Sequence, residues 1–272
     1  MVMFPGSRRH PPRWQTLALS ALAHAGYLVS LTVLVVIGVP ALLPLTVFPS
    51  WRRRVCRGLL RRFLIFFTRV YLPALRVYRV VEISGLDPLA PPRGMVCVAN
   101  HRSALDGLLL LPLVHPAAMV LKSKHARKPG YAGLVWLFDF IAMGATSLDG
   151  LRRAVDQCRR LLDEGVNLVV FPEGSRSSST RLLPFADFAF RLAAERRVPI
   201  LPVVVHSDRP FLNRQKGSYF PRDIIEFRIR FLPPVFPSAE DDAATLATRV
   251  RRFMATVLAD LDRAFLKPAW DK

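Results

Sequence analysis

Cysteine is scarce in this chain, and its distribution excludes two kinds of architecture. The 272 residues include 3 cysteines, Cys56, Cys97 and Cys158. An odd count without metal-ligand spacing argues against a disulfide framework and favours a reducing compartment with the cysteines in the core. The 6 histidines are also scattered without ligand spacing, so no metal site is expected.

Acidic residues are also few. Asp and Glu number 20 against 39 Lys and Arg, so the formal net charge at pH 7 is +19. A surplus of this size indicates an anionic partner, either nucleic acid or lipid. No helix-turn-helix, zinc-finger or RNA-binding signature is apparent, so nucleic acid is not expected as a partner. Membrane lipids remain the expected partner.

An apolar run over residues 17–48 supports that expectation, because it exceeds the roughly 20 residues that span a bilayer. It is too long for the apolar region of a cleaved signal peptide. Pro40 and Pro44 leave a second arrangement open, in which two shorter helices dip into one leaflet. A basic segment, 52–62, and an apolar stretch, 63–75, follow and are typical of contact with anionic headgroups. The aromatic side chains expected at interface depth are Trp51, Phe66, Phe67 and Tyr71.

The arginines around this run predict its orientation. Six arginines lie between residues 52 and 62, against Arg8, Arg9 and Arg13 on the other side. If the run spans the membrane, the rest of the chain lies on the cytoplasmic side, at the inner membrane in a bacterium. We therefore divide the chain into an anchor with a basic amphipathic segment, 1–76, and an α/β domain, 77–272.

Beyond residue 76, strands alternate with helices. Strands are expected at 77–83, 95–99, 166–170, 200–205 and 225–231, and helices at 151–164 and 186–196. The last strand alternates apolar with charged residues, which predicts a half-exposed position. A final helix opens at Asp241 and Asp242. The stripe that it is expected to bury comprises Leu246, Val250, Phe253, Val257, Leu261 and Phe265. The alternation predicts a mostly parallel, twisted sheet with helices on both faces.

A polar segment, Asn100-His-Arg-Ser-Ala-Leu-Asp106, follows the strand at 95–99, where ligands bind in open α/β sheets. His101 and Asp106 would lie roughly 140° apart on a single helix. They can meet if His101 lies in a loop and Asp106 in the first turn of the next helix. Asp106 then accepts the Nδ1 proton, which leaves Nε2 free to take a proton from a hydroxyl. A simpler interpretation, compatible with catalysis, is a capping box from Ser103 to Asp106.

A second polar segment, Phe171-Pro-Glu-Gly-Ser-Arg-Ser177, follows the strand at 166–170. Pro172 and Gly174 bracket Glu173, which suits a sharp turn that holds the acid over the end of the strand. Arg176 lies among serines, and a guanidinium beside hydroxyls and loop N–H groups suits a phosphate. The alternative is a solvated Ser-rich loop with a surface arginine.

The two segments, in this order, resemble the first and third signature blocks of the glycerolipid acyltransferases, the family of 1-acyl-glycerol-3-phosphate acyltransferases. Val198-Pro-Ile-Leu-Pro-Val203 resembles the fourth block, and the resemblance covers roughly residues 80 to 235. It implies a bitopic or monotopic membrane enzyme of phospholipid biosynthesis. Such an enzyme moves a fatty acyl group from an acyl-CoA or acyl carrier protein thioester to a lysophospholipid hydroxyl, and the thioester is a co-substrate, so no cofactor is needed.

Carried over by position, the resemblance implies that His101 is the general base and Asp106 its partner. The substrate-binding residues it implies are Glu173, Gly174, Ser175 and Arg176, with Arg176 on the acceptor phosphate, and Pro202 beside the acyl chain. Lys122 and Lys124 are candidates for steadying the oxyanion or holding an anionic donor, or else are surface charges beside the membrane.

The chain departs from the family pattern at the second block. Segment 141–149 lacks the arginine that usually joins the phosphate clamp, and segment 185–188 lacks a basic residue and a glycine. Both changes leave a second acceptor class open, an aminolipid or a polyene pigment lipid. A subgroup of the family that resembles this chain over 202–221 serves other lipids, including polyene pigment lipids. A third interpretation is a non-catalytic membrane scaffold, although intact His101, Asp106 and Glu173 argue against it. Acyl length, donor carrier and oligomeric state are not defined by the sequence.

Overall fold

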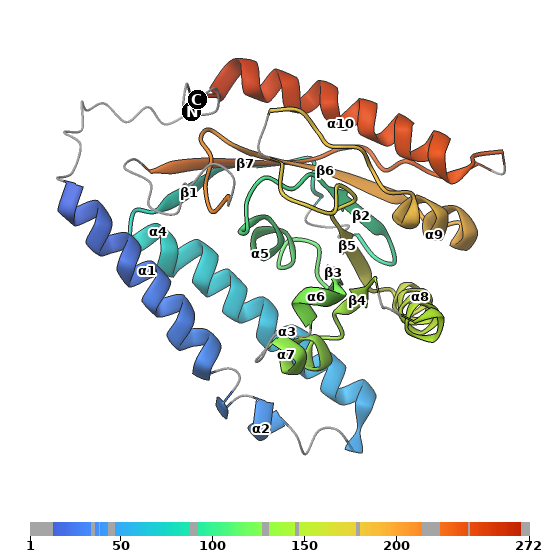
Figure 1. Ribbon diagram of the computed structural model, residues 1–272, viewed down its shortest axis with the longest axis horizontal. Helices are drawn as coiled ribbons and strands as arrows, with labels where there is room; N and C mark the ends of the chain where they lie inside the picture. The colour runs from blue at the N-terminus through green and yellow to red at the C-terminus, as the bar shows by residue number, and fades with distance from the viewer. Residues whose placement is uncertain are drawn as a thin grey trace.

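The computed structural model describes residues 13–33, 36–37, 39–42, 47–87, 92–126, 131–144, 147–177, 180–213, 224–238 and 240–267. A sheet with the strand order β1-β7-β6-β2-β5-β3-β4 forms its centre (Figure 1). The strands are β1 Tyr78–Ser84, β2 Val96–Ala99, β3 Ala117–Lys122, β4 Ile141–Met143, β5 Asn167–Val170, β6 Ile200–Ser207 and β7 Ile225–Phe231. Every described strand pair is parallel except β6 with β7.

Helices precede the sheet and alternate with its strands. Those before the sheet are α1 Arg13–Val33, α2 Val39–Leu42, α3 Pro49–Phe66, the π-helical η3 Phe67–Tyr71 and α4 Leu72–Ala74. Those within and after it are α5 Asp106–Leu110, α6 Ser123–Ala126, α7 Tyr131–Leu137, α8 Leu148–Asp163, α9 Phe188–Arg196 and α10 Ala243–Phe265. The predicted mostly parallel α/β sheet with helices on both faces is confirmed.

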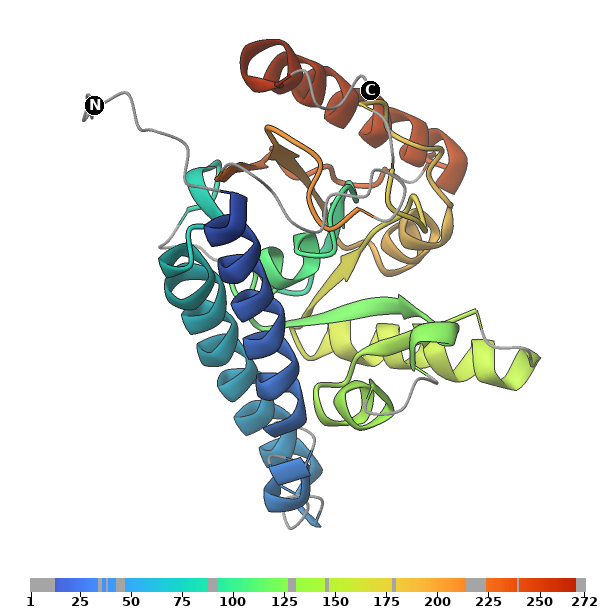
Figure 2. The same cartoon turned by 60° about the vertical axis from the view of Figure 1, so that its left-hand side comes forward.

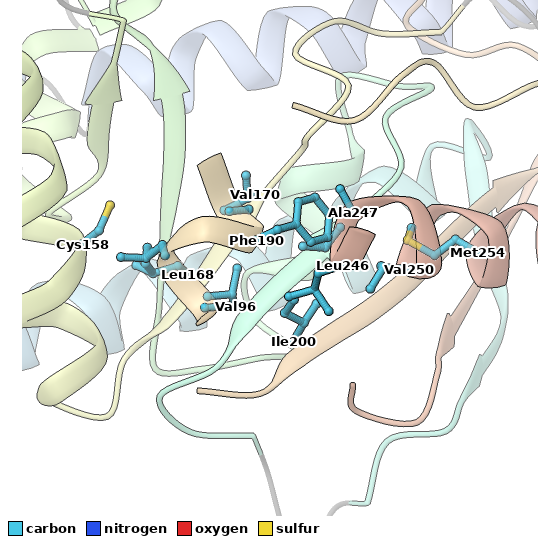
Figure 3. Close-up of a cluster of buried hydrophobic side chains, with 14 of the residues drawn as sticks. Val96, Cys158, Leu168, Val170, Phe190, Ile200, Leu246, Ala247, Val250 and Met254 are labelled. Atoms are coloured by element: carbon cyan, nitrogen blue, oxygen red, sulfur yellow. The ribbon is translucent and has the colours of Figure 1, made fainter. Parts of the chain in front are cut away.

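Two hydrophobic clusters lie on opposite faces of the sheet, because successive strand side chains point to opposite sides. In β2, Val96 and Val98 belong to the cluster under α8, α9 and α10, whereas Cys97 and Ala99 belong to the cluster under α3, η3 and α5. Figure 3 shows the first cluster, with strand residues such as Ile200 meeting Phe190 of α9 and Val250 of α10. The central strands are therefore buried on both faces and form a rigid base for the loops at their ends.

Part of the buried stripe that was predicted for the last helix, α10, is wrong. Leu246, Val250 and Leu261 are buried as expected, but Phe253 and Phe265 are each 37% exposed. Met254 is fully buried and Leu258 is buried with it. The buried side of the helix passes through Met254 rather than its neighbour Phe253, because an apolar stripe can continue by either three or four residues.

Strand β7 was predicted as half-exposed and is instead mostly buried. It pairs with β1 on one side and β6 on the other, so it lies inside the sheet. Arg228 is buried, and its guanidinium carbon lies 3.7 Å from the centroid of the Phe265 ring. The alternation of charge in this strand therefore reflects ion pairs and a cation–π contact rather than solvent exposure.

Strands β3 and β4 and helix α7 were not predicted. β3 is only partly buried and β4 has 3 residues, so neither has the continuous apolar pattern of the central strands. β4 pairs with β3 and forms the edge of the sheet. Short edge strands are the elements for which local sequence patterns are least informative.

The helices α1 and α3 run side by side in opposite directions (Figures 1 and 2). The Tyr71 hydroxyl donates a hydrogen bond to the Leu22 carbonyl oxygen at 3.0 Å. Gly26 permits this approach, since a Cβ atom there would overlap the Tyr71 hydroxyl. Within the described ranges, no helix combines the length and the apolar character required to cross a membrane. Parts of the anchor prediction depend on residues that lie outside the described ranges, namely Pro44, Arg8 and Arg9.

The basic segment was predicted to face headgroups, and this is wrong for part of α3. Arg57 is buried and donates to Asp139 at 3.0 Å, and Arg53 pairs with Glu164 at 3.4 Å. Phe67, expected at interface depth, is buried in the core. The ion pairs of Arg53 and Arg57 and the burial of Phe67 therefore fasten one face of this helical segment to the sheet domain. Trp51 and Phe66 are exposed, and their place at interface depth stays a prediction.

The helices before β1 share a core with the strands. The Tyr78 hydroxyl donates to the Thr68 carbonyl oxygen at 2.6 Å, and Phe67 packs in the same cluster as Phe227. The division into 1–76 and 77–272 stays a prediction about membrane attachment.

Candidate active site

The two polar segments lie together because their strands are neighbours. β2 and β5 pair in parallel, so the loops that follow them leave the same edge of the sheet. The Ser177 backbone N–H donates to the His101 carbonyl oxygen at 2.7 Å, which joins the two loops directly. His101 lies in the loop after β2, and Asp106 is the first residue of α5, in the arrangement that their spacing predicts.

Asp106 orients His101. Its Oδ2 atom lies 2.9 Å from His101 Nδ1 and also accepts the backbone N–H groups of Arg102 and Ser103, each at 2.8 Å. The contact with this carboxylate oxygen suits the tautomer with the proton on Nδ1. The predicted capping box is not formed, because the Ser103 hydroxyl accepts the Leu105 N–H at 3.2 Å and α5 has no side-chain N-cap. Asp106 Oδ2 instead holds the backbone of this loop and orients the imidazole.

The imidazole is held on its face as well as at its edge. The Phe171 ring stacks on the His101 ring with centroids 4.3 Å apart and an interplanar angle of 28°. The His101 side chain keeps 22% of its surface exposed, whereas the Asp106 side chain keeps 1%. Within the described part of the chain, the imidazole makes its hydrogen bond through Nδ1. Nε2 thus remains open to an external hydroxyl, which suits a general base.

Glu173 fastens the His101 loop to a neighbouring segment. Oε1 accepts the His101 backbone N–H and Oε2 accepts the Leu183 backbone N–H, both at 2.8 Å. Burial raises the pKa of the Glu173 carboxyl, although these two backbone hydrogen bonds act in the opposite direction. Both carboxylate oxygens are thereby used inside the protein. The geometry makes Glu173 a residue that positions His101.

Lys122 and Gly174 meet at the rim of this loop pair. Gly174 has a φ of +63°, a left-handed conformation that favours glycine. A Cβ atom at Gly174 would lie 3.5 Å from both Cε and Nζ of Lys122, so the ammonium group at the end of β3 lies against this turn. Lys122, Gly174 and Ser175 are exposed. A cation therefore lies at the turn that follows β5, where the Gly174 N–H itself donates to the Phe171 carbonyl oxygen at 3.0 Å.

Arg176 and Pro202 have neighbours that the sequence did not indicate. The Arg176 guanidinium donates to the Leu212 carbonyl oxygen, and the side chain is partly exposed. Pro202 is buried in β6 opposite Val98, and its carbonyl oxygen accepts the Leu232 N–H at 2.9 Å. The roles assigned to both residues stay predictions. Ser178 and Ser179 lie outside the described residues.

Several positioning residues were missed. The Asn100 side chain exchanges hydrogen bonds with the backbone of Val205, at 2.8 and 2.7 Å. The Asn213 amide donates to the carbonyl oxygens of Arg102 and Ser177, at 3.0 and 2.7 Å, and so bridges both loops. Asn100 and Arg102 stand inside the first polar segment, where buried polar side chains require partners. Nothing local to Asn213 marks it as a bridge.

The fold and the site together define an α/β protein with a carboxylate-oriented histidine at the carboxyl ends of parallel strands. Its similarities to known proteins point to the glycerolipid acyltransferase family. The family model described as "Acyltransferase" matches residues 80–206, which include both polar segments.

Relatives and a solved structure resemble the chain over most of its length. The human 1-acyl-sn-glycerol-3-phosphate acyltransferase alpha is 31% identical over 185 residues, covering 66% of this chain and 64% of the relative. The Saccharomyces cerevisiae 1-acyl-sn-glycerol-3-phosphate acyltransferase is 30% identical over 192 residues, covering 66% of this chain and 60% of the yeast protein. The chain thus spans less than two thirds of either relative. The crystal structure of the 1-acyl-sn-glycerophosphate (LPA) acyltransferase PlsC from Thermotoga maritima has a TM-score of 0.71 at 21% identity, covering 94% of this chain and 99% of that one, and shows the same fold.

Proposed function

We propose that this protein transfers a fatty acyl group from an acyl-CoA or acyl carrier protein thioester to the hydroxyl of 1-acyl-sn-glycerol-3-phosphate. The observation that carries the proposal is the 2.9 Å contact between His101 Nδ1 and Asp106 Oδ2, with Nε2 left open. The names of the human and yeast relatives support the same acceptor. An external hydroxyl as nucleophile requires a base of this kind and no covalent enzyme intermediate.

The proposed reaction is a single displacement. His101 Nε2 takes the proton of the acceptor hydroxyl as its oxygen attacks the thioester carbonyl, and the imidazolium is stabilised by Asp106. The tetrahedral intermediate carries a negative oxygen, to which the Lys122 ammonium group beside the Gly174 turn can donate a hydrogen bond. Collapse breaks the carbon–sulfur bond, and the leaving thiolate receives the proton from His101. The products are the ester and the free thiol.

Arg176 and Lys122 are the cations that we assign to anionic parts of the substrates. Arg176 follows the turn that carries Glu173, so a phosphate near the acceptor hydroxyl lies within reach of the same loop. The absent second-block arginine favours a second candidate, the same transfer to an aminolipid or polyene pigment lipid. The fewer cations a site presents, the less it discriminates in favour of a phosphate-bearing acceptor.

Attachment to a lipid surface fits the exposed apolar side chains of the helix pair. Leu28 and Val29 of α1 are 60% and 61% exposed, and Trp51 and Phe66 of α3 are 57% and 56% exposed. A solvated monomer rarely keeps so many large apolar groups in water on two adjacent helices. We propose that α1 and α3 lie in one leaflet.

The test uses the full chain in vesicles with labelled acyl-CoA and, separately, labelled acyl carrier protein. Each donor is offered 1-acyl-sn-glycerol-3-phosphate, a neutral lipid alcohol and an aminolipid. Transfer to the phosphate-bearing acceptor at the highest kcat/KM supports the proposal. Transfer to neither phosphate-bearing nor neutral lipid, with thioester hydrolysis also absent, would instead favour the scaffold interpretation.

A further inference from the structure

Arg102 follows His101 in the chain, but its side chain points away from the open side of the site. Its guanidinium is 2% exposed and makes a two-pronged ion pair with Asp262 of α10. The Nη1 atom lies 2.9 Å from Oδ1 and the Nη2 atom lies 2.9 Å from Oδ2. Nη2 also donates to the Thr180 carbonyl oxygen. Two parallel hydrogen bonds of this kind fix the plane of the guanidinium as well as its distance.

The backbone of Arg102 is part of the structure that orients the imidazole. Its N–H donates to Asp106 Oδ2 at 2.8 Å, the same oxygen that meets His101 Nδ1. Its carbonyl oxygen accepts from the Asn213 amide at 3.0 Å. Residues 100–105 belong to no helix or strand, so contacts of their side chains and backbone determine their shape. A shift of Arg102 would move one of the donors that hold the Asp106 carboxylate.

Two neighbours favour the ionised form of Asp262. Its side chain is 11% exposed, and His206 Nε2 lies 3.4 Å from its Oδ1. Burial alone would raise the pKa of Asp262, but the contacts with Arg102 and His206 outweigh it and hold the pKa below the ordinary value. The pair is separated by 160 positions in the sequence. Asp262 also lies outside residues 80–206, the region that the family model matches.

We propose that Arg102 and Asp262 form a positioning pair, through which helix α10 holds the His101 loop in its productive conformation. The inference rests on the proposed function, in which His101 is the base. A pair that only stabilised the fold would affect activity in proportion to stability. A positioning pair affects the rate of the chemical step even in a protein that is fully folded.

The experiment compares three variants in the full chain. Asp262→Asn removes one charge, and Arg102→Met combined with Asp262→Leu replaces both charges with apolar groups, which buried ion pairs commonly tolerate. Asp139→Asn is the matched control, because Arg57 and Asp139 form another buried ion pair at 3.0 Å. Thermal unfolding, kcat, KM for both substrates, and the NMR resonance of the His101 Nδ1 proton are measured for each.

Asp262→Asn is expected to lower kcat about tenfold or more while each KM changes by less than about threefold. The His101 Nδ1 resonance should shift, because the Asp106 carboxylate is less well held. The double variant should recover the melting temperature but neither kcat nor the resonance. Asp139→Asn should lower the melting temperature and leave kcat and the resonance at their wild-type values.

Recovery of wild-type kcat and resonance in the double variant would overturn the proposal, as would equal effects of Asp262→Asn and Asp139→Asn. The resonance does not depend on turnover. If the wild-type protein transferred no acyl group, the proposed function would fail, and the resonance alone would still decide whether the pair positions His101.

Discussion

The carboxylate of Glu173 holds the backbone N–H of His101 at 2.8 Å, and its second oxygen holds the Leu183 N–H at the same distance. A glutamine at this position offers one acceptor oxygen and one NH2 group, so one of the two N–H groups loses its partner. Glu173→Gln should therefore lower the free energy of unfolding by about 1–3 kcal/mol. Urea unfolding measures it. Glu195→Gln, an exposed residue paired with Arg159, is the control and should change stability by less than about 0.5 kcal/mol.

The same carboxyl should make stability depend on pH. Its pKa is raised above the ordinary value of 4.5, so the folded state binds more protons than the unfolded state just above that value. The contribution of Glu173 to stability therefore decreases as the pH rises from about 4.5 through the raised pKa, and then becomes constant. The difference in unfolding free energy between wild type and Glu173→Gln, measured from pH 4.5 to 8, should show this decrease. A difference that grew with pH would contradict it.

The orientation of the imidazole can be tested at Asp106. Asp106→Asn keeps the volume but replaces an acceptor oxygen, so the neutral imidazole is no longer held in the tautomer with a free Nε2. We expect kcat to fall by about two to four orders of magnitude, and His101→Ala to abolish transfer. Circular dichroism and thermal melts check that both variants fold. Acylation at the wild-type rate in His101→Ala would exclude the proposed mechanism.

Arg176 reports whether the acceptor carries a phosphate. A charge-assisted contact contributes about 1.5–3 kcal/mol, so Arg176→Ala should raise KM for 1-acyl-sn-glycerol-3-phosphate about tenfold to a hundredfold. KM for the thioester should hardly change. Arg191→Ala on the exposed face of α9 is the control, since it removes an equal charge far from the loop pair. Equal use of phosphate-bearing and neutral acceptors, insensitive to Arg176, would rule out this role.

The helix pair makes a separate prediction about lipid surfaces. Replacing Leu28 and Val29 with aspartate introduces two charges on the exposed apolar side of α1. Flotation with anionic vesicles should then recover markedly less protein than wild type, and high salt should release the remainder. Phe236→Asp is the control, because Phe236 is 69% exposed but lies outside the helix pair. Unchanged flotation of the α1 variant would show that α1 does not contact the bilayer.

The sequence predicted the elements whose signals are local. The strands β2, β5 and β6 are short apolar runs between turn residues. The sequence spacing of His101 and Asp106 likewise predicts that His101 lies in a loop and Asp106 in the helix that follows it. The partnership of Arg102 with Asp262 could not be predicted, since it depends on how α10 crosses the sheet. The buried partners of Arg53 and Arg57 escaped prediction for the same reason: an arginine-rich helix has the same sequence whether its charges meet lipid or protein.

The position of β7 has a consequence for how the protein is made. In the sheet, β1 has β7 as its neighbour, although the paired residues Arg79 and Glu226 are 147 positions apart in the chain. A growing chain must keep β1 without its neighbour until β7 has left the ribosome, and Asp262 emerges later still. The apolar helices, in contrast, emerge first and can reach a bilayer before any site exists. Chains released early would therefore occupy membrane without acquiring a supported His101 loop.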